Sequence, residues 1–139
     1  MKVSIIAIGD ELLIGQVIDT NSGSIARIRQ PAGWEVDNVA VVHDDADAIR
    51  EAIDRAFAST DIVLTTGGLG PTKDDITKST LCDYFGGTLR RDPLVLENIK
   101  EIFLKRGIKL NPLTVDQALV PTSCEVIQNR DGTAPIMWF

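Results

Sequence analysis

Residues 61–77 constrain the fold of this chain more than any other segment. The apolar run Ile62–Leu64 leads into a turn with three glycines and a proline, and two adjacent carboxylates, Asp74 and Asp75, follow where a helical pattern begins. A buried strand that ends in a glycine-rich loop opening onto a helix is how α/β folds present backbone N–H groups to phosphate. Acids beside a phosphate site indicate a cation between them. The segment therefore predicts a metal-assisted nucleotide or phosphate site.

Strand and helix patterns alternate along the rest of the chain. Apolar runs predict strands at Lys2–Ile8, Trp34–Val42, Asp61–Thr65, Ser123–Ile127 and Ile136–Phe139. Helical spacing and end signals predict helices at about Thr20–Ala32 (with Thr20, Asn21 and Ser22 as cap candidates), Ala46–Ala58, Ile76–Phe85, from Asp92-Pro93 to Gly107, and Leu113–Leu119. Strands separated by helices of this length pair in parallel and carry helices on both faces. We therefore predict an α/β fold with a mostly parallel sheet.

Length, charge and cysteine usage exclude several classes of protein. A chain of 139 residues is expected to form one domain, and its net charge of −6 argues against a nucleic-acid partner. No apolar stretch approaches the roughly 20 residues of a membrane span, and no signal-peptide pattern is present at the N-terminus. Cys82 and Cys124 fit no metal or redox spacing and are expected to be reduced thiols in a cytoplasmic protein. A single histidine, His43, excludes a histidine-based zinc site within one chain.

Polar side chains follow each of the first three predicted strands. They lie in Gly9–Gly15 with Asp19–Ser22, in His43–Asp45, and in Thr65–Asp75. Ligands of open α/β sheets bind beyond the carboxyl ends of the strands, so these segments are expected to converge. Clustered acids repel one another unless a cation or a proton relieves them.

Each acid also has an ordinary structural explanation. Asp74 or Asp75 could cap the helix at Ile76, and Asp44 and Asp45 could cap the helix at Ala46. Asp10 and Glu11 could complement a helix dipole, and His43 fits a solvated loop residue better than a catalytic base. The glycine loop matches neither the dinucleotide fingerprint nor the P-loop, and no Gly-x-Ser-x-Gly elbow is present.

Three motifs together resemble the N-terminal domain of the competence/damage-inducible protein A (CinA) family, in the MoaB/MogA-like molybdopterin-binding superfamily. They are Gly9-Asp10-Glu11-Leu12-Leu13 with Gly15 and Asp19-Thr20-Asn21, Thr65–Thr72 with Asp74–Thr77, and Gly132-Thr133-Ala134-Pro135. The resemblance covers essentially the whole chain. It implies a three-layer α/β/α fold and hydrolysis of the pyrophosphate of ADP-ribose, or of a related nucleotide diphosphate, with Mg²⁺ or a similar divalent metal.

The resemblance also implies roles for individual residues. Asp75 and Asp44 would be the catalytic metal ligands, with Asp45 competing for the second place. The substrate would be bound by Gly9, Asp10, Glu11, Gly15, Thr20, Asn21, Ser22, Thr66, Gly67, Gly68, Leu69, Gly70, Thr72 and Asp74. Relatives assemble as dimers or trimers, so a homo-oligomer is expected.

The chain departs from the family pattern at its C-terminal end. Ile136 stands where the family has glycine, and a pocket loop similar to Leu-Pro-Gly-Val-Pro would lie beyond Phe139. The apolar end Ile136–Phe139 predicts a chain cut inside the fold, with a docked terminal strand as the alternative. Two further hypotheses therefore stay open: molybdopterin adenylyl transfer on the same scaffold, and a non-catalytic binding or oligomerisation module.

Overall fold

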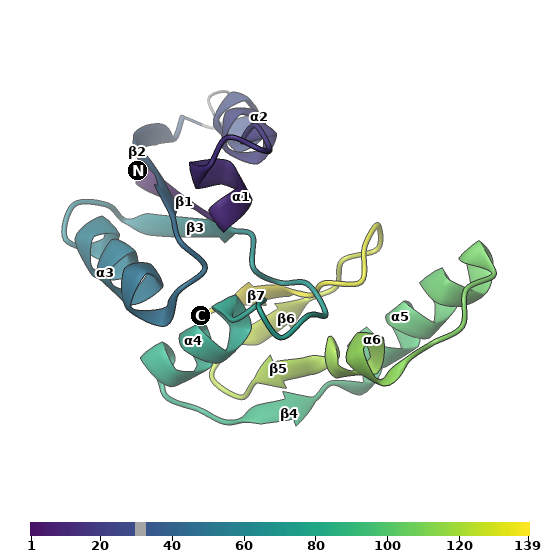
Figure 1. Cartoon of the computed structure of the whole chain (residues 1–139). Helices are drawn as coiled ribbons and strands as arrows, with labels where there is room; N and C mark the ends of the chain where they lie inside the picture. The colour runs from purple at the N-terminus through teal and green to yellow at the C-terminus, as the bar shows by residue number, and fades with distance from the viewer. Residues whose placement is uncertain (30–32) are drawn as a thin grey trace. The chain divides into compact units, whose positions relative to one another are not determined.

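The computed structural model describes residues 1–29 and 33–139, and these group into two compact units. The N-terminal unit is Met1–Gly68 and the C-terminal unit is Leu69–Phe139. Across the described residues, no helix combines the length and apolar character needed to cross a membrane. The elements form the predicted α/β fold, with a parallel sheet in the N-terminal unit (Figure 1).

Three parallel strands form the sheet of the N-terminal unit. They are β1 (Lys2–Ile8), β2 (Glu35–Val42) and β3 (Ile62–Thr66), in the order β2-β1-β3. At the carboxyl end of the sheet, Ile8 pairs with Val42 and Ala7 with Thr66. The apolar run of β1 supplies the centre of the sheet, where Val3 to Ile8 are all buried.

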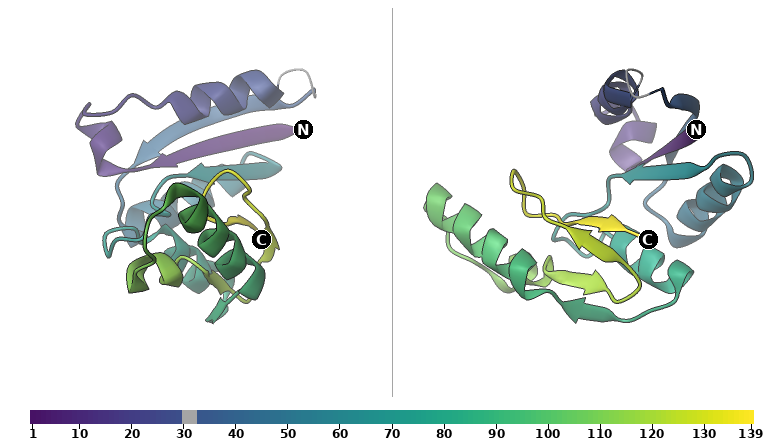
Figure 2. Two further views of the ribbon diagram at one scale, coloured as in Figure 1. Left: turned by 90° about the vertical axis from the view of Figure 1, so that its right-hand side faces the viewer. Right: turned by 180° about the vertical axis from the view of Figure 1, so that it is seen from behind.

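Helices cover both faces of this sheet. The chain passes from β1 to β2 through α1 (Asp10–Leu13) and α2 (Thr20–Arg29), and from β2 to β3 through α3 (Ala46–Phe57). These two crossovers run in opposite directions across the sheet, so right-handed connections place α2 and α3 on opposite faces, as Figure 1 and the two views of Figure 2 show. The predicted three-layer α/β/α arrangement is therefore present in this unit.

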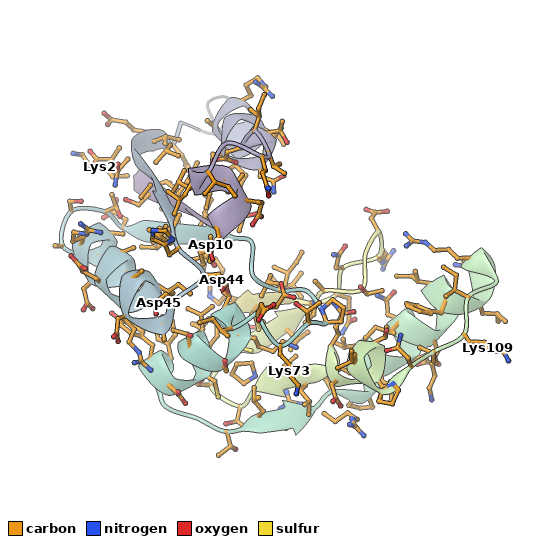
Figure 3. All side chains as sticks on the ribbon, in the orientation of Figure 1. Lys2, Asp10, Asp44, Asp45, Lys73 and Lys109 are labelled. Carbon is orange, nitrogen blue, oxygen red and sulfur yellow. The ribbon has the colours of Figure 1, made fainter. Side chains whose placement is uncertain are left out.

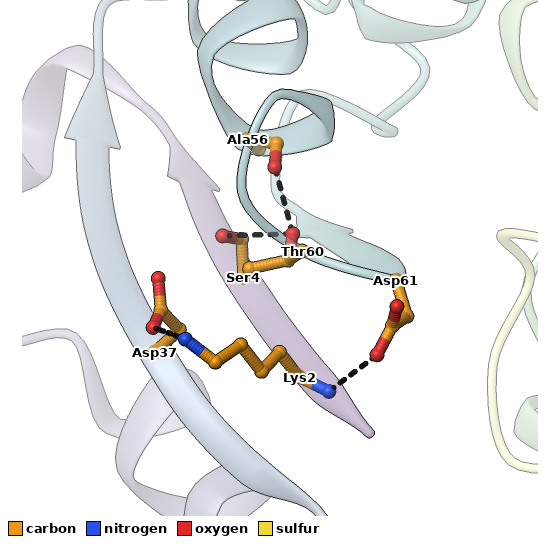
Figure 4. A network of polar contacts seen from close by, with 6 residues as sticks. All are labelled: Lys2, Ser4, Asp37, Ala56, Thr60 and Asp61. Carbon is orange, nitrogen blue, oxygen red and sulfur yellow. Dashed lines mark hydrogen bonds and ion pairs between the residues drawn. The ribbon is translucent and has the colours of Figure 1, made fainter.

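A polar network joins the amino-terminal end of the sheet to its neighbours (Figure 4). The Lys2 ammonium lies 3.1 Å from Asp37, and the Lys2 backbone N–H donates to Asp61 at 2.8 Å. The hydrogen bond to Asp37, with the attraction of nearby carboxylates, raises the pKa of Lys2. Deeper in the sheet, the buried Thr60 hydroxyl donates to the Ala56 carbonyl at 2.8 Å and lies 3.2 Å from the Ser4 hydroxyl. The polar groups at this end of the sheet are thus used in bonds within the chain. The carboxyl end of the sheet is therefore the candidate site.

The C-terminal unit combines three helices with two antiparallel strand pairs. The helices are α4 (Thr77–Phe85), α5 (Pro93–Arg106) and α6 (Pro112–Asp116). The strand pairs are β4 (Leu89–Arg91) with β5 (Leu119–Pro121), and β6 (Glu125–Ile127) with β7 (Ile136–Trp138). Val95, Ile99 and Ala118 form its buried core, with Phe103 and Val126 packed against them.

Most element boundaries agree with the sequence predictions, and a few do not. The helix predicted over Leu113–Leu119 is wrong at its end: α6 stops at Asp116, and Leu119 belongs to β5. Helix α2 is capped by the Asp19 carboxylate, which accepts the Ser22 N–H at 3.0 Å. The cap is therefore not one of the three predicted candidates, Thr20, Asn21 and Ser22. The end of the predicted helix at residues 30–32 lies outside the described residues.

Candidate functional site

The carboxyl ends of β1 and β2 bring Asp10 and His43 together. Gly9 donates its backbone N–H to the Val42 carbonyl at 3.1 Å, so the residues that follow the two strands are held side by side. Asp10 Oδ1 lies 2.7 Å from His43 Nδ1, and both side chains are exposed. The sequence analysis did not predict this pairing of Asp10 with His43.

The start of α2 is tied to the end of β3 at the same edge. The Asn21 side-chain amide donates to the Thr66 hydroxyl at 3.1 Å. One residue later, Ser22 is only 5% exposed, and its hydroxyl has no hydrogen-bond partner among the described residues. Two predicted ligand contacts, Asn21 and Thr66, therefore meet, and the buried hydroxyl of Ser22 directly follows Asn21 in the sequence.

Gly67 makes the close backbone contact that ends β3. It has a φ of 102°, and a Cβ built on it would lie 1.9 Å from the Ile8 carbonyl oxygen. Only glycine allows this approach of β3 to the end of β1. The next residue, Gly68, also has a positive φ of 62°, so the loop leaves the sheet through two consecutive residues that favour glycine.

Asp44 and Asp45 have different surroundings. The Asp45 carboxylate accepts the Ala48 N–H at 3.0 Å and caps α3, as the structural explanation predicted. Asp44 is half-buried, and its Oδ1 is shielded from solvent. Figure 3 shows both residues with Asp10 at this end of the sheet. Asp45 therefore serves as a helix cap, and the ligand role predicted for Asp44 stays a prediction.

In the C-terminal unit, the glycine loop folds around Asp75. The Thr72 N–H donates to Asp75 Oδ2 at 3.0 Å, and the Thr72 hydroxyl bonds to the same oxygen. A Cβ built on Gly70 would lie 2.6 Å from this carboxylate oxygen. Helix α4 has no side-chain cap, so the structural explanation for Asp75 as a helix cap is wrong. Instead, its carboxylate lies against the loop that the sequence predicts to bind phosphate.

The other predicted site residues lie on the surface of the unit to which they belong. In the N-terminal unit, Glu11 lies over Gly9, Gly15 has a φ of 75°, and Thr20 is exposed. In the C-terminal unit, Leu69 is half-buried and Asp74 is exposed. The predicted contribution of Asp44 and Asp75 to one metal site stays a prediction.

The oxygen donors present fit a magnesium ion that is held mainly by its substrate. In the part of the chain that the structure describes, no three His, Cys, Asp or Glu side chains gather as a metal cluster. Magnesium sites commonly use one or two carboxylates together with substrate phosphates and water. Asp44 or Asp75 could donate in this way, whereas a site made wholly of protein ligands is not found among these residues.

Comparison with known proteins points to one family. Residues 4–136 match the model described as "Probable molybdopterin binding domain". A CinA-like protein from Cytophaga hutchinsonii is 47% identical over 135 residues, which cover 97% of this chain and 32% of that protein. The crystal structure of CinA from Thermoplasma acidophilum, a protein with unknown function, has a TM-score of 0.84 at 37% identity, and the match covers 98% of this chain and 79% of that one.

More distant structures share the fold alone. The tungsten cofactor synthesizing protein MoaB from Pyrococcus furiosus has a TM-score of 0.62 at 20% identity, covering 99% of this chain and 78% of its own. The chain spans about a third of the length of the curated relatives that it matches.

Proposed function

Because the chain belongs to the molybdopterin-binding domain family, as a CinA-like member, we propose that it binds a phosphate-bearing pterin or nucleotide. The candidate contacts are the polar groups at the carboxyl end of the parallel sheet and, in the C-terminal unit, the N–H groups of the glycine loop. Binding of this kind requires donors for phosphate oxygens and polar groups for a sugar or a pterin ring. The family match over residues 4–136 is the observation that carries the proposal.

The described contacts support a binding role for the sheet edge. Two hydrogen-bonded pairs lie at this edge. Asp10 and His43, which follow β1 and β2, are 2.7 Å apart, and Asn21 in α2 donates to Thr66 at the end of β3 at 3.1 Å. Asp10, His43 and Asn21 are exposed, which leaves further donors and acceptors for a ligand, and Thr66 is half-buried. Polar groups that are fixed by their neighbours lose little entropy when a ligand arrives, which favours binding.

Calorimetry tests this proposal and separates the two ligand classes. The chain is titrated under anaerobic conditions with molybdopterin and, separately, with ADP-ribose and Mg²⁺. We expect saturable binding of at least one, and an Asn21→Ala substitution should weaken it, whereas Asp54→Asn on the exposed part of α3 should not. Absence of heat with both ligands, in a chain whose circular dichroism shows it to be folded, would refute the proposal.

A second candidate function is metal-dependent hydrolysis of ADP-ribose to AMP and ribose 5-phosphate. The position of Asp75 favours it, because this carboxylate is not a helix cap and lies against Gly70 in the glycine loop. The resemblance to the family implies Asp75 and Asp44 as the metal ligands, and a bound Mg²⁺ would polarise a phosphoryl oxygen and lower the pKa of water. The chain's backbone N–H groups and the Thr66 and Thr72 hydroxyls would orient the diphosphate.

Product analysis tests the hydrolytic function. The chain is incubated with ADP-ribose and Mg²⁺ or Co²⁺, and AMP is quantified by chromatography. We expect AMP above the level of an Asp75→Asn variant, whereas an Asp54→Asn variant on the exposed part of α3 serves as the control. Equal AMP from wild type and Asp75→Asn would refute hydrolysis and leave a binding module, the function that the departure of Ile136 from the family pattern also favours.

Assembly and compartment complete the proposal. We infer a homo-oligomer, dimer or trimer, from the resemblance to the family, and light scattering of the purified chain checks its mass. The two cysteines are buried and free, which fits a reducing compartment such as the cytoplasm. A monomer by light scattering would contradict the inferred assembly.

A further inference from the structure

Gln117 touches the glycine loop although no motif includes it. It lies directly after α6, and its side chain is only 5% exposed. Its side-chain amide donates to the Leu69 carbonyl at 3.3 Å. Leu69 is the first residue of the part of the loop that belongs to the C-terminal unit. The buried amide is therefore bonded to the beginning of the loop.

The same residue is also bonded to the far end of the loop. The Lys78 ammonium donates to the Gln117 backbone carbonyl at 3.1 Å. Lys78 lies in the first turn of α4, which begins immediately after Ile76. Burial lowers the pKa of Lys78, and the neighbouring Asp116 opposes this shift. Residue 117 thus contacts both flanks of the loop 69–76, through its side chain at one flank and its backbone at the other.

Gln117 is held in place by backbone hydrogen bonds and by the adjoining core. Its backbone N–H donates to the Thr114 carbonyl at 3.2 Å, and the next residue, Ala118, is fully buried in the core. The Ala118 carbonyl accepts the Asp92 N–H at 2.8 Å, and the Asp92 side chain caps α5. A side chain placed by a helix end and a core residue is a firmer support than one on a free loop.

We propose that Gln117 is a positioning residue that holds the two flanks of the glycine loop at a fixed separation, so that the loop presents its N–H groups to the phosphates of the ligand. This inference rests on the proposed function. Between the two flanks, the Thr72 N–H donates to Asp75 and the Asp75 N–H donates to the Thr72 carbonyl at 3.2 Å. Without Gln117, the Leu69 carbonyl loses its buried partner, the loop samples more conformations, and each ligand contact costs more ordering entropy.

The test compares Gln117→Leu with Gln128→Leu, which makes the same chemical change at a half-buried position of the same unit. Amide exchange at Thr72 and Asp75 is measured by NMR, and ADP-ribose affinity with Mg²⁺ by calorimetry. Loss of one hydrogen bond corresponds to about a fivefold change in an equilibrium constant. We expect Gln117→Leu to raise both exchange rates and the dissociation constant about fivefold, and Gln128→Leu to leave all three unchanged.

Two results would overturn the inference. One is an amide exchange rate at Thr72 and Asp75 that stays at the wild-type value in the Gln117→Leu variant. The other is a uniform rise in exchange over the whole C-terminal unit, which indicates a general loss of stability rather than positioning. If Gln117→Leu does not fold, Lys78→Met replaces it: exchange should rise at the same two amides and return toward wild type in Lys78→Arg, which keeps the donor. If the wild-type chain binds no ligand, the proposed function fails, while the exchange measurements still decide the role of Gln117.

Discussion

Replacing Gly67 with alanine is expected to destabilise the N-terminal unit strongly. The new Cβ would lie 1.9 Å from the Ile8 carbonyl oxygen, whereas real Cβ contacts essentially never fall under 3.0 Å, so the backbone of β1 or β3 must move by about 1 Å. A φ of 102° adds roughly 1–3 kcal/mol of strain for a residue with a side chain. Each sheet hydrogen bond disturbed by the movement costs about 1 kcal/mol more. We expect a total loss of about 3 kcal/mol or more.

Gly15→Ala is the matched control for this prediction. Gly15 also has a positive φ, 75°, but nothing lies within 4 Å of a Cβ built on it. Its substitution should cost only the backbone term, roughly 1–2 kcal/mol. Urea unfolding followed by circular dichroism at 222 nm gives both values. If Gly67→Ala loses no more stability than Gly15→Ala, the close approach of β3 to β1 does not exist as described.

Three further changes have expected outcomes in the same unfolding assay. Asp45→Ala removes the cap of α3 and should cost about 1 kcal/mol, and Asp45→Asn clearly less. Ile99→Ala should lower the free energy of unfolding by about 2–5 kcal/mol because Ile99 is fully buried in the core of the C-terminal unit. Leu104→Ala, at an 82% exposed position, should change that free energy by no more than about 0.5 kcal/mol. Burial raises the pKa of Cys82 and Cys124 above the ordinary 9.0, so the thiols of the unfolded chain ionise first and stability is lost as pH rises through 9. A Cys82→Ala/Cys124→Ala variant should therefore lose less stability than the wild type between pH 8 and 10. Equal losses of stability would contradict the burial of the thiols.

Local sequence signals determined the elements that were predicted well. The apolar run Lys2–Ile8 coincides with β1, because a strand buried on both faces needs apolar residues at every position. Asp92 and Gly107 mark the ends of α5, where the Asp92 carboxylate accepts two N–H groups and Gly107 adopts a left-handed conformation with a φ of 66°. Caps and glycine ends act within a few residues, so the sequence alone reveals them.

The elements that were missed depend on partners far away in the chain. The three-residue strands β4 and β5 pair with each other across about thirty intervening residues, and the exposed Leu89-Arg90-Arg91 has no strand pattern of its own. The end of α6 was extended into β5 for the same reason, because Leu119 fits either element. Short strands are defined by pairing, which a single sequence does not display.

The candidate site shows the same contrast between residues found from local sequence signals and contacts that depend on distant residues. The motif residues were identified from glycine and acid patterns, whereas the contacts of His43 and Gln117 were not. A signal for His43 existed, since Asp10 and His43 each follow one of two strands that were expected to be parallel and close. Nothing in the local sequence distinguishes Gln117 from an exposed glutamine, because its role depends on the contact with Leu69, 48 residues earlier in the chain.

NMR titration of the ¹⁵N-labelled chain with ADP-ribose and Mg²⁺, or with molybdopterin under anaerobic conditions, tests the proposed ligand site most directly. The proposal predicts saturable shifts of the amide signals of Asp10, Asn21, Thr66 and the loop 67–72, with little change in α5 or in the β6–β7 pair. Saturable shifts confined to other surfaces, or no shifts with either ligand at millimolar concentration, would contradict it.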